Sequence, residues 1–250
     1  MQLTHMLKFG WKTLQFSALI ALLLLTVIPI LEVAFYRNIN PHHSNLMWIR
    51  HYQDKEKNPL YDLRQHWVKL EEISSHLILA VRLAEDHQFF EHLGVYFSAL
   101  GKAFENTLMG EKTAGYSTIT QQTAKNLFLY PKKSFFRKGM EVYFALLMEL
   151  IWGKERILEV YLNIIELGEG VFGIERGAQK WFAKSPKDLF FDESCLLSAI
   201  LSKPRKLNPV EPNGEVTWRA SYIYRRGIKR AMEAKNAPPP HAPMPLFRLI

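Results

Sequence analysis

An uncharged apolar run near the amino terminus, FSALIALLLLTVIPIL at residues 16–31, constrains the fold of this chain more than any other feature. With its neutral flanks, the run approaches the ~20 residues that a helix needs to cross a bilayer. A cleaved signal peptide is the alternative, but the run is long for a signal core and no small-x-small cleavage site follows it. We therefore expect an uncleaved transmembrane anchor over residues 14–35.

Basic residues on the two sides of this run bear on its orientation. Lys8 and Lys12 precede it without an acidic residue, and positive charge favours the cytoplasmic side. The tail at residues 1–13 is therefore expected in the cytoplasm, and the rest of the chain outside it. Positive charge beyond the run opposes this assignment; it comes from Arg37, Arg50, Lys55 and Lys57.

The composition is that of a folded protein with one or two domains, since the 250 residues are 48% hydrophobic. The formal net charge of +8 indicates an anionic partner, which could be a nucleic acid, an acidic membrane surface or a phosphorylated small molecule. The single cysteine, Cys195, excludes an intramolecular disulfide and a CxxC metal site, and its apolar neighbours predict a core position.

Helical patterns dominate the chain after residue 70. Residues 36–70 are polar and contain Pro41 and Pro59, so we expect a linker there. Residues 71–235 predict one mainly α-helical domain without convincing strands or internal repeats. Residues 236–250 form a proline-rich tail. Within the domain, helices are expected from 71 through 92, from 118, and over 136–153, 154–168, 172–185, 192–203 and 216–235.

The stretch AEDHQFFEHLG places two adjacent carboxylates among apolar and aromatic residues. On a helix, Glu85, Phe89 and His92 would share one face, with Asp86 about a quarter of the circumference away. Apolar neighbours would desolvate Glu85 and raise its pKa, which suits a general acid or base near neutral pH. A solvated helix turn with a charge pair is an equal alternative. A two-histidine metal site would need i, i+4 spacing and is not favoured.

The stretch TAGYSTITQQTAKN leads into a second helix, where Thr118 and Gln121 fit the S/T-x-x-Q capping box. Free backbone N–H groups and the helix dipole favour an anion at such a terminus. This is a possible phosphate cradle without the glycine pattern of a P-loop, and an ordinary capped helix is the alternative. Donors within two turns are Ser117, Thr118, Gln121, Gln122 and Lys125.

The stretch KKSFFRKGME concentrates basic residues ahead of a glutamate. Arg137 and Glu141, at i and i+4, could form no more than a surface ion pair. Alternatively, the basic residues and the acid together could hold a diphosphate. Interleaved aromatic residues favour a membrane surface over nucleic acid as the partner. The residues concerned are Tyr130, Lys132, Lys133, Phe135, Phe136, Arg137, Lys138 and Glu141.

Five ordered stretches within residues 77–210 resemble the motifs of the glycosyltransferase family 51 domain. They are EDHQFFEHLG, GYSTITQQTAKN, RKGME, KERILEVYLNIIELGEGVFGIERGAQKWF and LLSAILSKPRKLNP. The chain is most similar to the monofunctional peptidoglycan glycosyltransferases of this family, because the residues beyond 210 leave no room for a transpeptidase domain.

The resemblance implies a fold and a reaction. The fold would be mainly α, with a lysozyme-like helical head, a small membrane-associated jaw within residues 96–136 and one preceding transmembrane helix. The enzyme would polymerise lipid II into glycan strands by inverting transfer and release undecaprenyl diphosphate. It would act at the extracytoplasmic side of the bacterial inner membrane on lipid II and the growing lipid-linked strand. Cell-wall synthesis or division proteins are possible partners, and nucleic acid is not expected.

The resemblance also implies residue roles. Glu85 would take the proton from the acceptor 4-hydroxyl, and Glu141 would be a second acid near the leaving group. No cofactor is required, although a divalent cation, Mg²⁺ or Mn²⁺, could assist at the diphosphate; the sequence holds no separate metal motif. Substrate-binding roles, including those that shape the site, fall to Asp86, Phe89, His92, Ser117, Thr118, Gln121, Gln122, Lys125, Lys133 and Arg137.

Two further functions fit parts of the pattern. A lysozyme-like enzyme that cleaves peptidoglycan would also use a glutamate on a helix. A non-catalytic, membrane-tethered basic scaffold would also carry the positive charge. The expected anchor and diphosphate-binding cluster favour synthesis, because a hydrolase that acts on finished strands needs neither. Tyr116 stands at a position that is usually small in the family and could reshape the donor-side loop.

Overall fold

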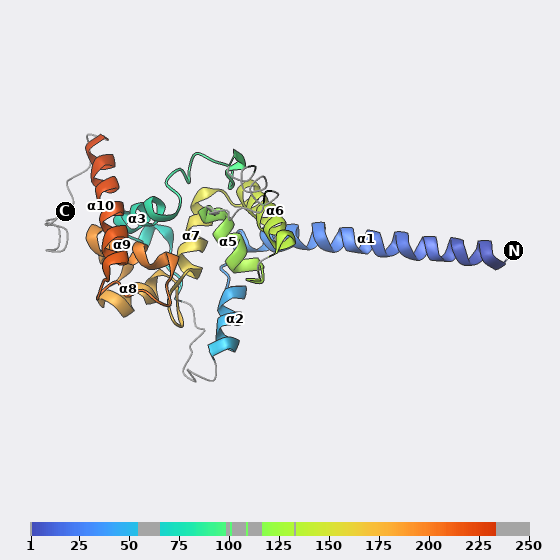
Figure 1. Ribbon diagram of the computed structural model, residues 1–250, viewed down its shortest axis with the longest axis horizontal. Coiled ribbons are helices and arrows are strands. Elements are labelled where there is room, and N and C mark those ends of the chain that lie inside the picture. Colours follow the sequence, from blue (N-terminus) through green and yellow to red (C-terminus); the bar gives the residue numbers. More distant parts are fainter. Residues whose placement is uncertain are drawn as a thin grey trace. The chain divides into compact units, whose positions relative to one another are not determined.

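Figure 1 shows the computed structural model, which describes residues 2–54, 66–98, 101, 109, 117–132 and 134–233, with side chains from residue 11 onward. The chain divides into two compact units, Met1–Ile39 and Asn40–Ile250. Several predictions lie outside the described residues: those on Tyr116, on Lys133, on residues 99–100, 102–108 and 110–116 of the jaw, on residues 55–65 of the linker and on the proline-rich tail.

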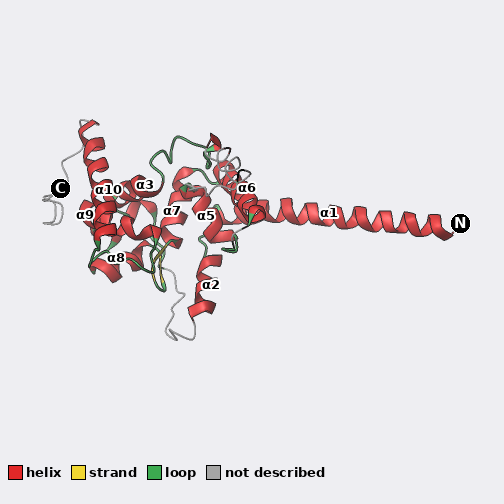
Figure 2. Cartoon of the chain, in the orientation of Figure 1, coloured by secondary structure: helices red, strands yellow, loops and turns green. Residues whose placement is uncertain are grey.

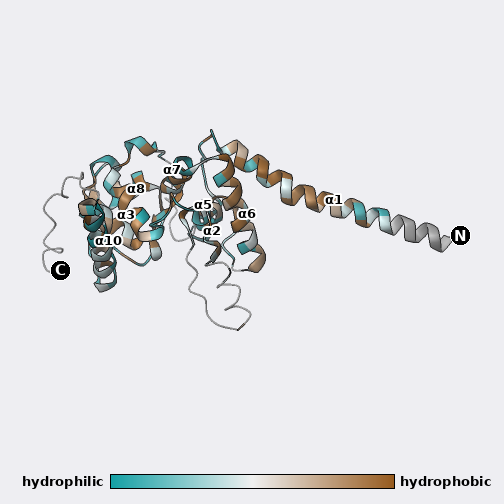
Figure 3. Cartoon of the chain, turned by 90° about the horizontal axis from the view of Figure 1, so that it is seen from above, coloured by the Kyte–Doolittle hydropathy of each residue, from teal (hydrophilic) through white to brown (hydrophobic). Residues whose placement is uncertain are grey.

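The first unit is a single helix, α1 (Gln2–Tyr36). Its part from Trp11 to Tyr36, 26 residues, is long and apolar enough to cross a membrane, as the hydropathy colours of Figure 3 illustrate. At 1.5 Å per residue, this part spans about 39 Å, against about 30 Å for a hydrocarbon core. Most of its large apolar side chains are exposed rather than packed against protein. The predicted anchor, residues 14–35, falls within this segment.

The second unit is mainly helical, as predicted (Figure 2). Short 3₁₀ turns and one antiparallel hairpin, β1 (Glu166–Gly168) with β2 (Val171–Phe172), complete the regular structure of the described residues. The helices are α2 (Asn45–Asp54), α3 (Ser75–Glu85), α5 (Ile119–Phe128), α6 (Phe135–Ile151), α7 (Lys154–Ile164), α8 (Ile174–Phe182), α9 (Phe191–Ala199) and α10 (Gly214–Glu233).

The hairpin corrects the prediction of a helix that continues to Gly168. Helix α7 ends because its C-cap, Ile165, is extended, with φ −65° and ψ 143°. Glycines with positive φ then turn the chain, at Gly170 (φ 70°) and Gly173 (φ 78°). The Gly173 N–H donates to the Ile165 carbonyl at 2.9 Å and closes the turn. The expectation of a mainly helical domain is confirmed, but the expectation that it lacks strands was wrong at this point.

Helix α2 corrects the prediction of a linker over residues 36–70. Long-range contacts hold this helix, and local sequence patterns do not report them. The Asn45 side-chain amide donates to the Phe128 carbonyl at 2.8 Å. At the other end of α2, the buried Asp54 carboxylate pairs with the Arg205 guanidinium at 2.9 Å. The polar stretch thus contributes a helix to the folded unit.

The hydrophobic core surrounds α9, every residue of which is buried. Cys195 is buried on this helix, which confirms its predicted core position. Helix α9 packs against α3 and α10, whereas α5 packs against α6 and α7. The carboxyl end of α3 and the amino end of α5 meet where these two groups of helices join, and this junction carries the candidate site.

Candidate active site

Helix α3 ends at Glu85, earlier than predicted. Its C-cap, Asp86, has φ −161° and ψ 80°, so the chain leaves the helix there. Glu85, Phe89 and His92 therefore do not share a helix face, and that prediction was wrong. The reason is tertiary: the Asp86 carboxylate turns away to accept the backbone N–H of Ile119, the first residue of α5, at 3.1 Å.

Asp86 is the buried hub of the site. Besides the Ile119 N–H, it accepts the Tyr96 hydroxyl at 2.8 Å and lies 2.9 Å from Nε2 of His92. The Gly94 N–H donates to Nδ1 of His92 at 3.0 Å, so the proton of the neutral imidazole sits on Nε2 and points at Asp86. His92 is thus a hydrogen-bond partner of Asp86.

Asp86 also occupies the helix terminus that was predicted to cradle phosphate. The Gln121 N–H is taken by the Thr118 side chain at 3.0 Å, and the Gln122 N–H by the Thr118 carbonyl at 2.9 Å. The capping box of Thr118 and Gln121 is confirmed, and both side chains are buried. Thr118 further donates to the Gly94 carbonyl at 2.5 Å. The alternative, an ordinary capped helix, therefore describes this terminus, because the anion on it is the protein's own carboxylate.

Phe89 is fully buried rather than exposed to a cleft. The Lys154 ammonium lies 4.5 Å from its ring centroid and pairs with Glu149 at 2.7 Å. Thr120 donates to the same Glu149 oxygen, at 2.7 Å. These contacts connect the turn after α3 with α5, α6 and α7. Phe89 therefore holds this turn in place and does not line the cleft.

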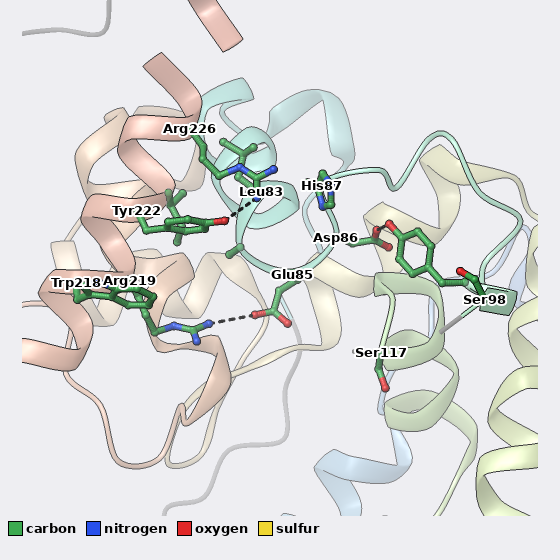
Figure 4. Close-up of a pocket in the computed structure, with 13 residues that line it drawn as sticks. Leu83, Glu85, Asp86, His87, Ser98, Ser117, Trp218, Arg219, Tyr222 and Arg226 are labelled. Atoms are coloured by element: carbon green, nitrogen blue, oxygen red, sulfur yellow. Dashed lines mark hydrogen bonds and ion pairs between the residues drawn. The ribbon is translucent and has the colours of Figure 1, made fainter. Parts of the chain in front are cut away.

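Glu85 faces a cleft of about 680 Å³ (Figure 4). The Gln122 amide donates to its Oε2 at 2.7 Å, and the Tyr161 hydroxyl donates to the Gln122 carbonyl oxygen at 3.3 Å. Burial raises the pKa of Tyr161 well above its ordinary value, and the charges of Glu85 and Asp86 raise it further. Tyr161 therefore stays a donor and fixes the orientation of the Gln122 amide. The other oxygen, Oε1, lies 3.8 Å from the Arg219 guanidinium.

Glu141 forms the second acidic centre and is almost fully buried. The Arg137 guanidinium donates to its Oε2 at 2.6 Å, and the Lys138 ammonium pairs with its Oε1. Lys138 also donates to the Ser117 hydroxyl at 3.1 Å. The surface ion pair considered from spacing is therefore a buried network, in which the acid orders two basic side chains.

Lys125 adds a third positive charge to this network, which we call the basic cluster (Lys125, Arg137 and Lys138 around Glu141). Burial lowers the pKa of Lys125; Arg137 and Lys138 reinforce this shift, whereas Glu141 and Glu85 oppose it. Over the part of the chain that the structure describes, no carboxylate hydrogen-bonds to Lys125. Among the described residues, three cations surround the Glu141 carboxylate, and Glu85 is a second carboxylate whose charge acts on Lys125. The surplus of positive charge around Glu141 favours binding of an anion.

The cleft and the basic cluster belong to one site. Ser117 lines the cleft of Glu85 and also accepts a hydrogen bond from Lys138 of the cluster. Several residues of the site were not predicted: Tyr96, Tyr161, Arg219 and two aromatic residues of α10, Trp218 and Tyr222. The i, i+4 spacing of Trp218 and Tyr222 indicates that the two rings share a face of α10. Nothing in the sequence, however, shows that this face lies next to Glu85.

The site combines a hydrogen-bonded carboxylate in a cleft with a basic cluster around a second carboxylate, in a chain that carries an apolar helix long enough to cross a membrane. These features together are typical of membrane-associated enzymes that act on anionic substrates. The chain belongs to the Transglycosylase family, whose model matches residues 54–227.

Named relatives cover most of the chain. It is 42% identical over 231 residues to the biosynthetic peptidoglycan transglycosylase of Bdellovibrio bacteriovorus, with 92% of each chain covered. The protein of the same name from Caulobacter vibrioides is 41% identical over 216 residues, which are 86% of this chain and 92% of the relative. The protein of the same name from Xylella fastidiosa is 37% identical over 219 residues, which are 86% of this chain and 88% of the relative.

Proposed function

We propose that this protein is a peptidoglycan glycosyltransferase that polymerises lipid II into glycan strands, with inversion and release of undecaprenyl diphosphate. Its family and the names of its relatives support the reaction. The observation that carries the proposal is the joint site: a hydrogen-bonded glutamate, Glu85, shares one cleft region with the basic cluster around Glu141. A hydrolase of finished strands has no diphosphate to bind.

Glu85 is the general base in this proposal. It takes the proton of the acceptor sugar's 4-hydroxyl, whose oxygen attacks the anomeric carbon of the donor. The bond from that carbon to the diphosphate breaks on the opposite face, so the configuration inverts. Gln122, held by Tyr161, fixes one oxygen of Glu85 and leaves Oε1 toward the cleft. A base fixed in this way loses little entropy when it meets the hydroxyl.

The basic cluster receives the leaving diphosphate. Charge develops on the diphosphate as the glycosidic bond breaks, and preoriented cations stabilise that charge. Glu141 holds Arg137 and Lys138 in place, while Lys125 has no carboxylate of its own within the described chain. We also assign Lys133 to this group from its sequence position. Glu141 therefore acts by ordering the cations and by balancing part of their charge.

The residues of this site do not fit a cation held by the protein. Divalent cations prefer several oxygen ligands, yet both oxygens of Glu141 already pair with Arg137 and Lys138. The described residues contain no group of three or more His, Cys, Asp or Glu that could hold a metal ion. We propose that Mg²⁺ or Mn²⁺ enters only as a counter-ion of the diphosphate. Calorimetric titration of Mg²⁺ into substrate-free protein should then give no binding heat.

The finer architecture is also proposed: a lysozyme-like head and a jaw that touches the membrane. Exposed aromatic side chains at the start of α6, Phe135 and Phe136, support a membrane contact, as does exposed Tyr130 just before them. Their exposed basic neighbour Lys132 would favour anionic lipid. A surface of this kind would let the catalytic unit meet a lipid-linked substrate at the headgroups.

Replacing Glu85 by Gln tests the function. Polymerisation of labelled lipid II should fall by about 10² to 10⁴ fold, the usual contribution of a general base. Thermal unfolding in detergent should change little, because the Gln carbonyl can still accept from Gln122. Glu175→Gln, on α8 and outside the cleft, is the matched control and should keep full activity. Glu85→Gln with normal polymerisation, or native protein that only shortens preformed strands, would contradict the proposal.

A further inference from the structure

Three residues of α10 form a ladder along one side of the helix: Trp218, Tyr222 and Arg226, at i, i+4 and i+8. The Trp218 and Tyr222 rings are stacked, with centroids 5.9 Å apart and planes inclined by 12°. The Arg226 guanidinium lies 5.5 Å from the Tyr222 ring centroid and donates to the Tyr222 hydroxyl at 3.0 Å. Tyr222 therefore has a partner on each side, whereas Trp218 stands at the open end of the ladder (Figure 4).

This open end is exposed and lies at the catalytic cleft. Trp218 is 65% exposed and Tyr222 43% exposed, and both line the cleft that contains Glu85. In Figure 4 the ladder lies on one side of Glu85, and Ser117, the link to the basic cluster, lies on the other. Large aromatic rings are usually buried, so a stacked pair that stays accessible beside the proposed catalytic base indicates a surface that binds a ligand.

The helix that carries the ladder is firmly held. Next to Trp218, the Arg219 side chain donates to the Ala199 carbonyl at 3.0 Å and approaches Glu85. On the packed side of α10, a Cβ at Gly227 would lie 2.2 Å from the Phe191 ring, so the helix backbone touches the core directly. The ladder is thus a fixed surface at a fixed place relative to Glu85, as a binding subsite requires.

The chemistry of this surface fits a sugar ring. A pyranose has one face of C–H groups, which packs on a flat aromatic ring, and a rim of hydroxyls, which needs hydrogen-bonding groups nearby. Trp218 offers a large ring face and an indole N–H, and Arg219 and Arg226 flank the rings with donors. An acyl chain has no polar groups to accept hydrogen bonds from these donors. A diphosphate has no apolar face that could pack on the rings.

We propose that the ladder, with Trp218 as its contact face, is a carbohydrate subsite that binds an amino-sugar ring beside Glu85, on the side away from the basic cluster. The inference rests on the proposed function, because that function makes the ligand a glycan. Two sources offer the same ring chemistry: the disaccharide of an incoming lipid II molecule and the end of the growing strand.

Kinetics of Trp218→Ala in full-length protein test the subsite. Loss of the ring should weaken substrate binding before the chemical step, so the KM should rise about 10-fold with little change in kcat. Trp218→Phe keeps a ring and should recover most of the loss. Met232→Ala is the matched control, since Met232 is 75% exposed on the same helix but does not line the cleft.

The products distinguish the two sources. A higher KM for lipid II in the first coupling, with normal strand length, assigns the subsite to lipid II; shorter strands with a normal first coupling assign it to the growing strand. Unchanged KM and strand length in Trp218→Ala, or a lower kcat alone, would overturn the subsite while native protein still polymerises. If native protein fails to polymerise lipid II, the proposed function itself is wrong.

Discussion

Adjacent residues of this site have different roles because different partners reach them. Asp86 accepts hydrogen bonds from Tyr96 and from the backbone of Ile119 and is buried with its charge satisfied. Glu85 has Gln122 on one oxygen, whereas its other oxygen lies 3.8 Å from Arg219 at the cleft. A buried carboxylate that is fully hydrogen-bonded supports structure, whereas a partly satisfied one at a cleft can exchange a proton.

Lys125 gives a prediction for the pH dependence of the reaction. Burial lowers its pKa, so its positive charge is complete at low pH and is lost, as the pH rises, earlier than for an exposed lysine, whose pKa is about 10.4. The ratio kcat/KM should therefore fall on the alkaline side below that value. Lys125→Arg stays charged and should move this fall to higher pH. Initial rates of the native protein and of Lys125→Arg, measured across the alkaline pH range, test this prediction. If kcat/KM falls at the same pH in both proteins, a group other than Lys125 causes the fall.

The hairpin after α7 shows how one element depends on a single residue type. Gly173 has φ 78°, and a Cβ there would lie 2.7 Å from the Asn163 carbonyl oxygen. The Asn163 side chain bonds both backbone groups of Val68, at 2.8 and 2.9 Å. Close approach of the glycine backbone therefore joins the hairpin to α7 and to the segment before α3.

Gly173→Ala should destabilise the fold by roughly 1–3 kcal/mol, through a strained backbone and a contact that must move. Thermal unfolding in detergent measures the effect as a lower Tm. Gly139→Ala on α6 is the matched control, because a Cβ there meets nothing within 4 Å and alanine favours a helix over glycine. Equal Tm values for Gly173→Ala and the native protein would show that the hairpin carries no such strain.

At the scale of the whole molecule, an apolar helix precedes a helical unit that carries the site. We propose that this unit lies on the extracytoplasmic side of the inner membrane, because Lys8 and Lys12 precede the span. Cys195 makes the proposal easy to test. It is buried, and burial raises the pKa of its thiol well above the ordinary value, so the native background of thiol labelling should be low.

A membrane-impermeant maleimide should label Lys187→Cys in intact spheroplasts, because this position is exposed in the turn before α9. Thr4→Cys, in the tail that precedes the span, should react only after the membrane is permeabilised. The reverse pattern would place the catalytic unit in the cytoplasm and would also remove its access to an extracytoplasmic substrate.

Local patterns in the sequence determined the helical class, the apolar span, the capping box of Thr118 with Gln121 and the five family motifs, because each depends on residues a few positions apart. Tertiary structure decided where α3 ends, since the partner of Asp86 is Ile119. It also decided that Glu141 is buried and that Trp218 stands beside Glu85. Such contacts join distant parts of the chain, and their energies depend on packing that no local spacing records.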